Sequence, residues 1–163
     1  MAFDLGGLLA ALVRGKVDFV VIGGIAVAAH GYIRATEDLD LVPDPDPDNL
    51  DRLVNVLVTL DGRLTRNQQR ELDPAVRQAL YRGRGLSATT RLGDVDVVQR
   101  LPGVPPYAEL KASAGAVKAF GVTLSVAARD HLIAMKRARG APIDLADLER
   151  LDGGVEPPSS RLR

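Results

Sequence analysis

The stretch Val21-Ile22-Gly23-Gly24, followed by a helix-length gap and then by Asp38-Leu39-Asp40, decides how this chain is interpreted. An apolar run that ends in two glycines predicts a strand that turns into a short helix. Side chains alternate between the faces of a strand, so Asp38 and Asp40 point the same way while Leu39 faces a core. Two carboxylates on one face repel each other unless a proton or a cation lies between them. Mg²⁺ binds through one or two carboxylates plus substrate phosphates, so the pattern indicates phosphoryl or nucleotidyl transfer.

A two-metal site for such a reaction needs a third carboxylate near the first pair. Asp96 is the candidate, because it lies inside the apolar run Val95–Val98, where an unpaired charge is costly. Asp94 shares its face but falls in the predicted turn, where acidic residues are common for local reasons. We therefore expect Asp38, Asp40 and Asp96 to hold two Mg²⁺ ions, with Asp96 also orienting or deprotonating the attacking hydroxyl.

Nucleotide contacts are expected around the acidic pair. Gly23 and Gly24 let phosphates approach the backbone, whose free N–H groups at the start of a helix favour anions. Arg34 and Thr36 precede the pair and would add a charge-assisted contact and a hydroxyl donor.

The periodicity of apolar residues predicts the remaining elements. Helices are expected over 3–13, 25–30, 50–60, 74–81, 107–112, 128–139 and 143–151. Strands are expected over 17–22, 37–42, 86–91, 95–100, 117–120 and 122–126. This order is typical of an α/β fold (an α+β mixed sheet) with helices packed on the sheet, in one domain over 1–152 with a disordered tail over 153–163. Apart from its helix, the Arg- and Gln-rich segment 61–85 shows no clear pattern.

Composition excludes several classes of protein. Lys+Arg and Asp+Glu both total 21, so the net charge does not favour nucleic acid or membrane as a partner. There is no Cys, which excludes disulfides and thiolate metal sites. The chain shows no signal-peptide pattern and no apolar run as long as a membrane span, so we expect a soluble cytoplasmic protein with no membrane partner.

These motifs resemble those of the DNA polymerase β-type nucleotidyltransferase superfamily. The matching pattern is Gly23-Gly24, a helix, Asp38-x-Asp40 and, in a later strand, Asp96. The resemblance implies a nucleotidyltransferase core built on a mixed sheet, Mg²⁺ as cofactor, and a nucleoside triphosphate such as ATP as substrate.

More narrowly, the run from Ile22 to Leu41 is similar to small bacterial nucleotidyltransferases, including the AbiEii/AbiGii and MenT-like toxins of toxin–antitoxin systems. The runs 130–136 and 144–148 fit the same resemblance, which implies that Lys136 neutralises phosphate charge and that Asp144 is a structural acid. The toxins suggest nucleotide addition to a tRNA 3′ end, with a cognate antitoxin protein as partner.

Three functions stay open at this point. The first is the tRNA-modifying toxin, and the second is the same enzyme with a small-molecule acceptor such as an aminoglycoside or lincosamide antibiotic. The third, a noncatalytic binding domain of the same fold, is disfavoured by intact acids at all three positions. A cationic antibiotic predicts a closed acidic pocket. An RNA acceptor predicts a basic stripe beside the acidic site, built from Arg63, Arg66, Arg70, Arg77, Arg82 and Arg84.

Overall fold

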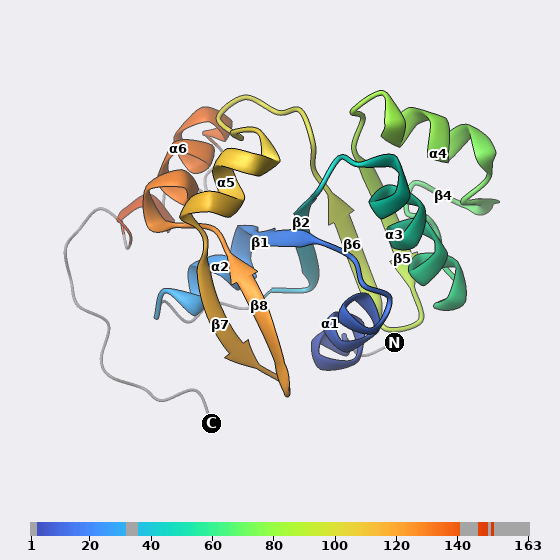
Figure 1. Ribbon diagram of the computed structural model, residues 1–163, viewed down its shortest axis with the longest axis horizontal. Helices are drawn as coiled ribbons and strands as arrows, with labels where there is room; N and C mark the ends of the chain where they lie inside the picture. The colour runs from blue at the N-terminus through green and yellow to red at the C-terminus, as the bar shows by residue number, and fades with distance from the viewer. Residues whose placement is uncertain (1–2, 32–35, 141–146, 150, 152–163) are drawn as a thin grey trace.

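The computed structural model describes residues 3–31, 36–140, 147–149 and 151. Within them, one mixed sheet of eight strands runs through the molecule in the order β4-β3-β5-β6-β2-β1-β8-β7 (Figure 1). The strands are β1 (Phe19–Ile22), β2 (Asp38–Pro43), β3 (Arg63–Leu64), β4 (Asn67–Glu71), β5 (Leu86–Thr90), β6 (Gly93–Val97), β7 (Gly115–Ala119) and β8 (Val122–Val126). The helices are α1 (Leu5–Arg14), α2 (Gly23–Ala29), α3 (Pro47–Thr59), α4 (Pro74–Tyr81), α5 (Tyr107–Ser113) and α6 (Arg129–Arg139). The mixed α/β sheet that the sequence predicts is confirmed.

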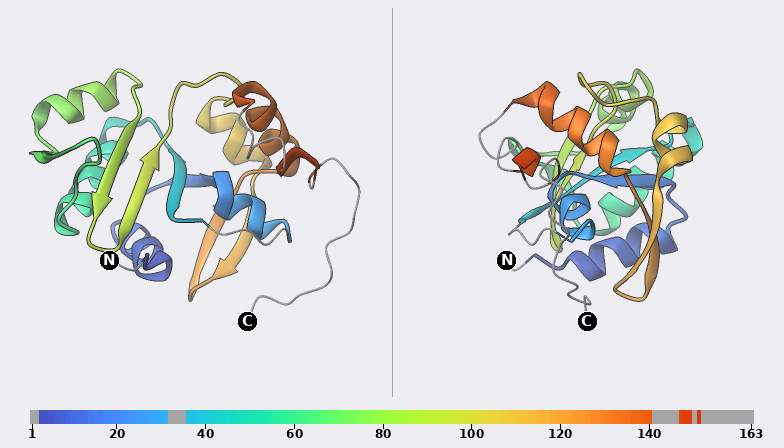
Figure 2. Two further views of the ribbon diagram at one scale, coloured as in Figure 1. Left: turned by 180° about the vertical axis from the view of Figure 1, so that it is seen from behind. Right: turned by 90° about the vertical axis from the view of Figure 1, so that its left-hand side faces the viewer.

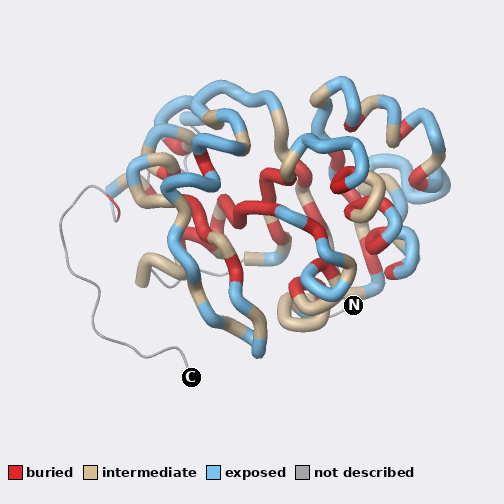
Figure 3. Tube along the Cα trace, in the orientation of Figure 1, coloured by how far each residue is buried: buried red, intermediate tan, exposed pale blue. Residues whose placement is uncertain are grey.

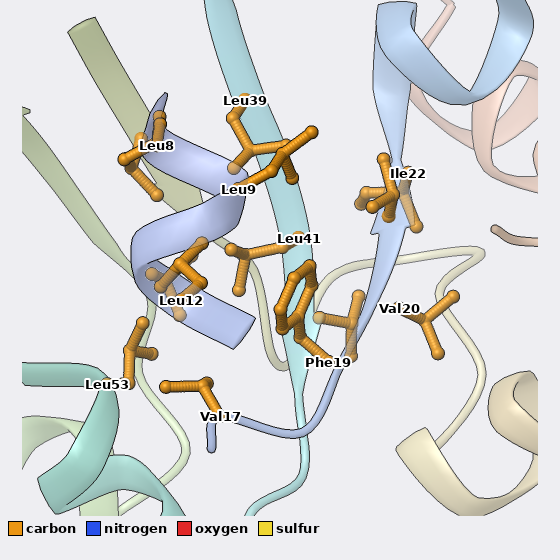
Figure 4. Close-up of a cluster of buried hydrophobic side chains, with 14 of the residues drawn as sticks. Leu8, Leu9, Leu12, Val17, Phe19, Val20, Ile22, Leu39, Leu41 and Leu53 are labelled. Atoms are coloured by element: carbon orange, nitrogen blue, oxygen red, sulfur yellow. The ribbon is translucent and has the colours of Figure 1, made fainter. Parts of the chain in front are cut away.

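The main core lies between α1 and the central strands. Leu8, Leu9 and Leu12 recur at helical spacing on α1 and are fully buried. Figure 4 shows them beside Leu39 and Leu41 of β2, which are also fully buried. Burying each such side chain contributes about 1.5–3 kcal/mol relative to leaving it in water. Figure 3 shows that burial is concentrated along these central strands.

Strand alternation then determines what the opposite face of β2 carries. Because Leu39 and Leu41 enter the core, Asp38 and Asp40 project from the other side of the strand, where both are only partly buried. β2 pairs with β1 antiparallel and with β6 parallel, so it is a central strand with a fixed register on both sides. The acidic residues are therefore held by the middle of the sheet.

The segment 61–85 contains two strands that the sequence analysis did not predict. β3 and β4 form a short antiparallel pair at one end of the sheet, and all five residues of β4 are exposed. A strand that is polar on both faces shows no alternation, so its sequence carries no strand signal. α4 follows with the predicted bounds, and Asp73 caps it by accepting a hydrogen bond from the Val76 N–H.

The helix predicted from Leu50 begins earlier, at Pro47. Proline is tolerated in the first turn of a helix because its missing N–H has no partner there. The Asp46 side chain accepts a hydrogen bond from the Asp48 N–H at 2.9 Å and caps the helix.

The predicted tail over 153–163 and Arg34 lie outside the described residues. The predicted helix over 143–151 lies partly outside them, although 147–149 and 151 are helical. Among the described helices, none combines the length and the apolar character needed to cross a membrane.

Candidate active site

Three carboxylates meet on the face of the sheet opposite the α1 core. Asp38, Asp40 and Asp96 each offer an oxygen, and these oxygens all lie within 4.8 Å of one another. The parallel pairing of β2 with β6 sets Asp40 beside Asp96 and Asp38 beside Asp94. Asp94 is not part of the cluster, so the structure brings together the three acids that the sequence analysis selected.

Crowding and burial act on the acid–base behaviour of this cluster. Desolvation, followed by the charges of Asp38 and Asp96, raises the pKa of Asp40 to about 7. Burial and the neighbouring Asp96 also raise the pKa of Asp38. Three carboxylates this close are costly while they are all ionised, and a divalent cation between them would remove the repulsion. Carboxylate oxygens are the ligands that Mg²⁺ prefers, so these residues fit such an ion.

Two hydroxyl groups orient the acids. Ser87 Oγ donates a hydrogen bond to Asp96 Oδ1 at 2.5 Å across the β5–β6 pair. Thr36 Oγ1 donates to the Asp38 main-chain oxygen at 3.1 Å and lies 3.4 Å from Asp38 Oδ1. Ser87 was not predicted, because the turn between the strands expected over 86–91 and 95–100 was placed at Gly93-Asp94. The turn lies at Arg91-Leu92 instead and β6 begins at Gly93, which sets Ser87 beside Asp96.

Gly23 is part of the site because of the space that it leaves. Its φ is +69°, and a Cβ built there would lie well inside van der Waals contact with Asp40 Oδ2. Any other residue would therefore be strained and would displace a carboxylate of the cluster. Gly24 follows as a buried residue of α2. The glycine pair therefore allows the end of β1, the start of α2 and the Asp40 carboxylate to pack closely against one another.

A cavity of about 300 Å³ adjoins the cluster on the β1 side. Gly23, Asp40 and Lys136 line it. Its apolar lining comes from Ile22, Val98, Leu101, Val104, Leu132 and Met135. This volume is at the lower end for small-molecule pockets, which are mostly apolar with a few placed polar groups.

Lys136 reaches this cavity as half of a buried ion pair. It is 7% exposed, and its Nζ lies 3.1 Å from Asp147 Oδ2, which belongs to a residue that is 2% exposed. The charge of Lys136 also opposes the rise in the pKa of Asp40, so the ammonium group acts on the acidic cluster. The sequence analysis named Lys136 but gave Asp147 no role, and the acid that it did name, Asp144, lies outside the described residues.

Comparisons with known proteins agree with this architecture. No protein-family model matches the chain, and no curated protein matches it. The solution structure of the antibiotic-resistance factor ANT(2'')-Ia is similar over 93% of this chain and 83% of its own, with a TM-score of 0.58 and 17% identity. A crystal structure of ANT(2'')-Ia in complex with adenylyl-2''-tobramycin is similar over 88% and 82%, with a TM-score of 0.56 and 18% identity. At these identities the likeness shows the fold, which is the nucleotidyltransferase fold.

Proposed function

We propose that this protein is a Mg²⁺-dependent nucleotidyltransferase, which moves a nucleoside monophosphate from a nucleoside triphosphate to a hydroxyl acceptor and releases pyrophosphate. The observation that carries the proposal is the cluster of Asp38, Asp40 and Asp96, with mutual distances under 4.8 Å, on the central strands of a nucleotidyltransferase fold. A noncatalytic binding domain would have no use for three mutually repelling carboxylates.

The residues of the cluster would bind the metal and accept a proton. Asp38, Asp40 and Asp96 would together hold the Mg²⁺ of the reaction, and Asp96 would also act on the acceptor hydroxyl. Bound Mg²⁺ would supply charge neutralisation and a more acidic attacking hydroxyl. Ser87 orients Asp96 by donating to Oδ1, and the Asp96 carboxylate would accept the proton of the acceptor hydroxyl. The hydroxyl oxygen bonds to the α-phosphorus, the bond from that phosphorus to the bridging oxygen breaks, and pyrophosphate leaves.

The nucleotide would lie between the acids and α6. The cavity of about 300 Å³ beside Asp40, called here the nucleotide cavity, would give the nucleoside an apolar lining, and the Lys136 ammonium would neutralise phosphate charge. Asp147 holds that ammonium in place, so we assign it a positioning role. Thr36 donates to Asp38, and it would therefore act on the nucleotide through that carboxylate. Backbone contacts at Gly23-Gly24 and a contact from Arg34 stay predictions.

Two acceptors are candidates. The likeness to ANT(2'')-Ia, one structure of which contains adenylyl-2''-tobramycin, favours the hydroxyl of an antibiotic. The resemblance of the motifs to bacterial toxins favours the 3′ end of a tRNA, with an antitoxin protein as a regulatory partner. The two differ in charge, because an aminoglycoside is a cation and a tRNA is a polyanion.

Labelled transfer tests the proposal. The full chain is incubated with each of the four α-labelled nucleoside triphosphates and Mg²⁺, with total tRNA in one series and aminoglycosides in the other. We expect label on one class of acceptor, no label in EDTA and none with Asp40→Ala. Asp94→Ala is the matched control, because it removes an acid of the neighbouring strand β6 that lies outside the cluster, and it should keep its rate within about tenfold. Transfer that survives Asp40→Ala, or no transfer to either class, would overturn the proposal.

A further inference from the structure

A second and larger cavity lies on the opposite side of the acidic cluster. It measures about 740 Å³ and is enclosed by the β3–β4 pair, α4 and the start of β5. Four arginines line it, together with Ser87 and two amide side chains, Asn67 and Gln78. This cavity is called here the arginine groove, and its four arginines are Arg66, Arg70, Arg82 and Arg84.

The charge of the arginine groove is largely uncompensated. All four arginines are exposed, and no Asp or Glu is among the described residues that line the groove. Arg70 lies 3.6 Å from Asp73, with both side chains about half exposed. In the described part of the chain, the other three arginines have no carboxylate within ion-pair distance. A protein with no net charge thus concentrates positive charge in one cavity.

Ser87 connects the arginine groove to the acidic cluster. Ser87 lines the groove and also donates the 2.5 Å hydrogen bond to Asp96, the acid assigned to the attacking hydroxyl. The nucleotide cavity touches the cluster at Asp40, toward β1 and α6. Since the strand order is β5-β6-β2-β1, the two cavities lie on opposite sides of the acids. In Figure 2, α4 and β4 accordingly lie at one end of the molecule and α2 and α6 toward the other.

The six arginines of the expected basic stripe fall into two groups in the structure. Arg63 lies 3.8 Å from Glu71, and Arg77 is bound to Asp51 and Asn55, so these two have acidic or amide partners. The other four line the arginine groove. These arginines would repel a cationic aminoglycoside. A guanidinium group can instead bind two oxygens of one phosphate at the same time. Four exposed arginines line the one groove, so it offers guanidinium groups to more than one phosphate.

We infer that the arginine groove binds the backbone phosphates of an RNA acceptor, and that it delivers the terminal hydroxyl of that RNA to Asp96. This inference rests on the proposed function for the role of the hydroxyl, while the binding itself needs neither metal nor nucleotide. Asn67 and Gln78 would hydrogen-bond to riboses or base edges, as expected for a single-stranded end.

Fluorescence anisotropy tests the binding step. The full chain is titrated, in EDTA and without nucleotide, into a labelled hairpin RNA that has a single-stranded 3′ end. The double variant Arg82→Ala/Arg84→Ala should weaken binding by about tenfold or more, and the slope of log affinity against log salt should become shallower by about 1.4, at about 0.7 per phosphate contact on a single strand. The control Arg14→Ala/Lys118→Ala removes the same charge from exposed positions on α1 and β7, and it should stay within about twofold of the parent.

The outcomes separate this inference from the proposed function. Arginine-dependent RNA binding with no label transferred to any acceptor supports the groove and contradicts the function. Label on tobramycin at equal rates in the parent and in Arg82→Ala/Arg84→Ala supports the function and overturns the inference. RNA affinity that both double variants reduce equally would also overturn it. So would competition by a ribose phosphate as strong as that by the RNA, because the ligand would then be a small phosphorylated molecule.

Discussion

Replacing Asp40 with Asn should stabilise the metal-free protein at neutral and alkaline pH while it abolishes nucleotidyl transfer. Asp40 lies in a partly buried cluster with Asp38 and Asp96, and the pKa of its carboxyl is raised from an ordinary value of 3.8 to about 7. Above that pH the folded protein must hold a third negative charge beside two others. Asn keeps the shape of the side chain and removes the charge.

The pKa shift sets the size and the pH window of the effect. The folded carboxyl binds its proton more tightly than the unfolded one, so between about pH 4 and pH 7 the native state holds more protons than the unfolded state. The free energy of unfolding of the parent therefore falls as the pH rises through this window, and the full loss is present above pH 7. At 1.36 kcal/mol per pKa unit, the loss is about 4 kcal/mol. Solvent screens the exposed part of the cluster, so we expect about 2 kcal/mol.

Urea denaturation at several pH values, in EDTA, measures this directly. Asp40→Asn should exceed the parent in the free energy of unfolding by about 2 kcal/mol at pH 8, and the difference should shrink toward pH 4.5. Asp94 lies outside the cluster, and of the groups that raise the pKa of Asp38 its charge contributes least, so Asp94→Asn should stay within about 0.5 kcal/mol of the parent. Saturating Mg²⁺ should reverse the order, because a ligand at 100 times its Kd adds about 2.7 kcal/mol to a protein that binds it. An Asp40→Asn protein that is less stable than the parent at pH 8 in EDTA would refute the reasoning.

The other predictions concern the groups around the acids. Gly23→Ala should cost about 1–2 kcal/mol of stability and most of the transfer activity, since its Cβ would strain a positive φ and push against a carboxylate; urea denaturation and labelled transfer check both. Ser87→Ala should lower kcat about tenfold with KM for the nucleotide unchanged, because one hydrogen bond to Asp96 is lost; a rise in KM with kcat unchanged would contradict the assigned role. Asp147→Asn should cost about 3 kcal/mol in thermal unfolding, because it removes the carboxylate that pairs with the buried Lys136 ammonium.

The sequence predicts best those parts of the structure in which a local pattern of residues follows directly from a physical constraint. Asp38-Leu39-Asp40 alternates, and the structure buries Leu39 and leaves the acids on the other face. Asp96 was preferred over Asp94 because Asp94 was expected in a turn; it is Asp96 that joins the cluster, although β6 contains both residues and the expected turn was wrong. The alternation of β2 needed only strand periodicity, whereas the choice of Asp96 also used the cost of a buried charge.

The parts that were missed depend on contacts between distant segments. Ser87 has no motif of its own, and its role follows from the register of a strand pair. Asp147 meets Lys136 only because two segments fold together. The β4 strand is exposed on both faces, so hydrophobic patterning could not reveal it or the groove that it helps to enclose.

The placement of the acids on β2 and β6, with a hydrophobic core behind them, has a practical consequence. The acids are held in position by the pairing of β2 with β6 in the interior of the sheet. Replacing one carboxylate with an amide should therefore abolish nucleotidyl transfer and leave the surface of the protein unchanged. Such an inactive variant would be suited to affinity capture. Immobilised on a resin, it could bind the natural acceptor from a cell extract without modifying it. Sequencing or mass spectrometry could then identify the bound molecule.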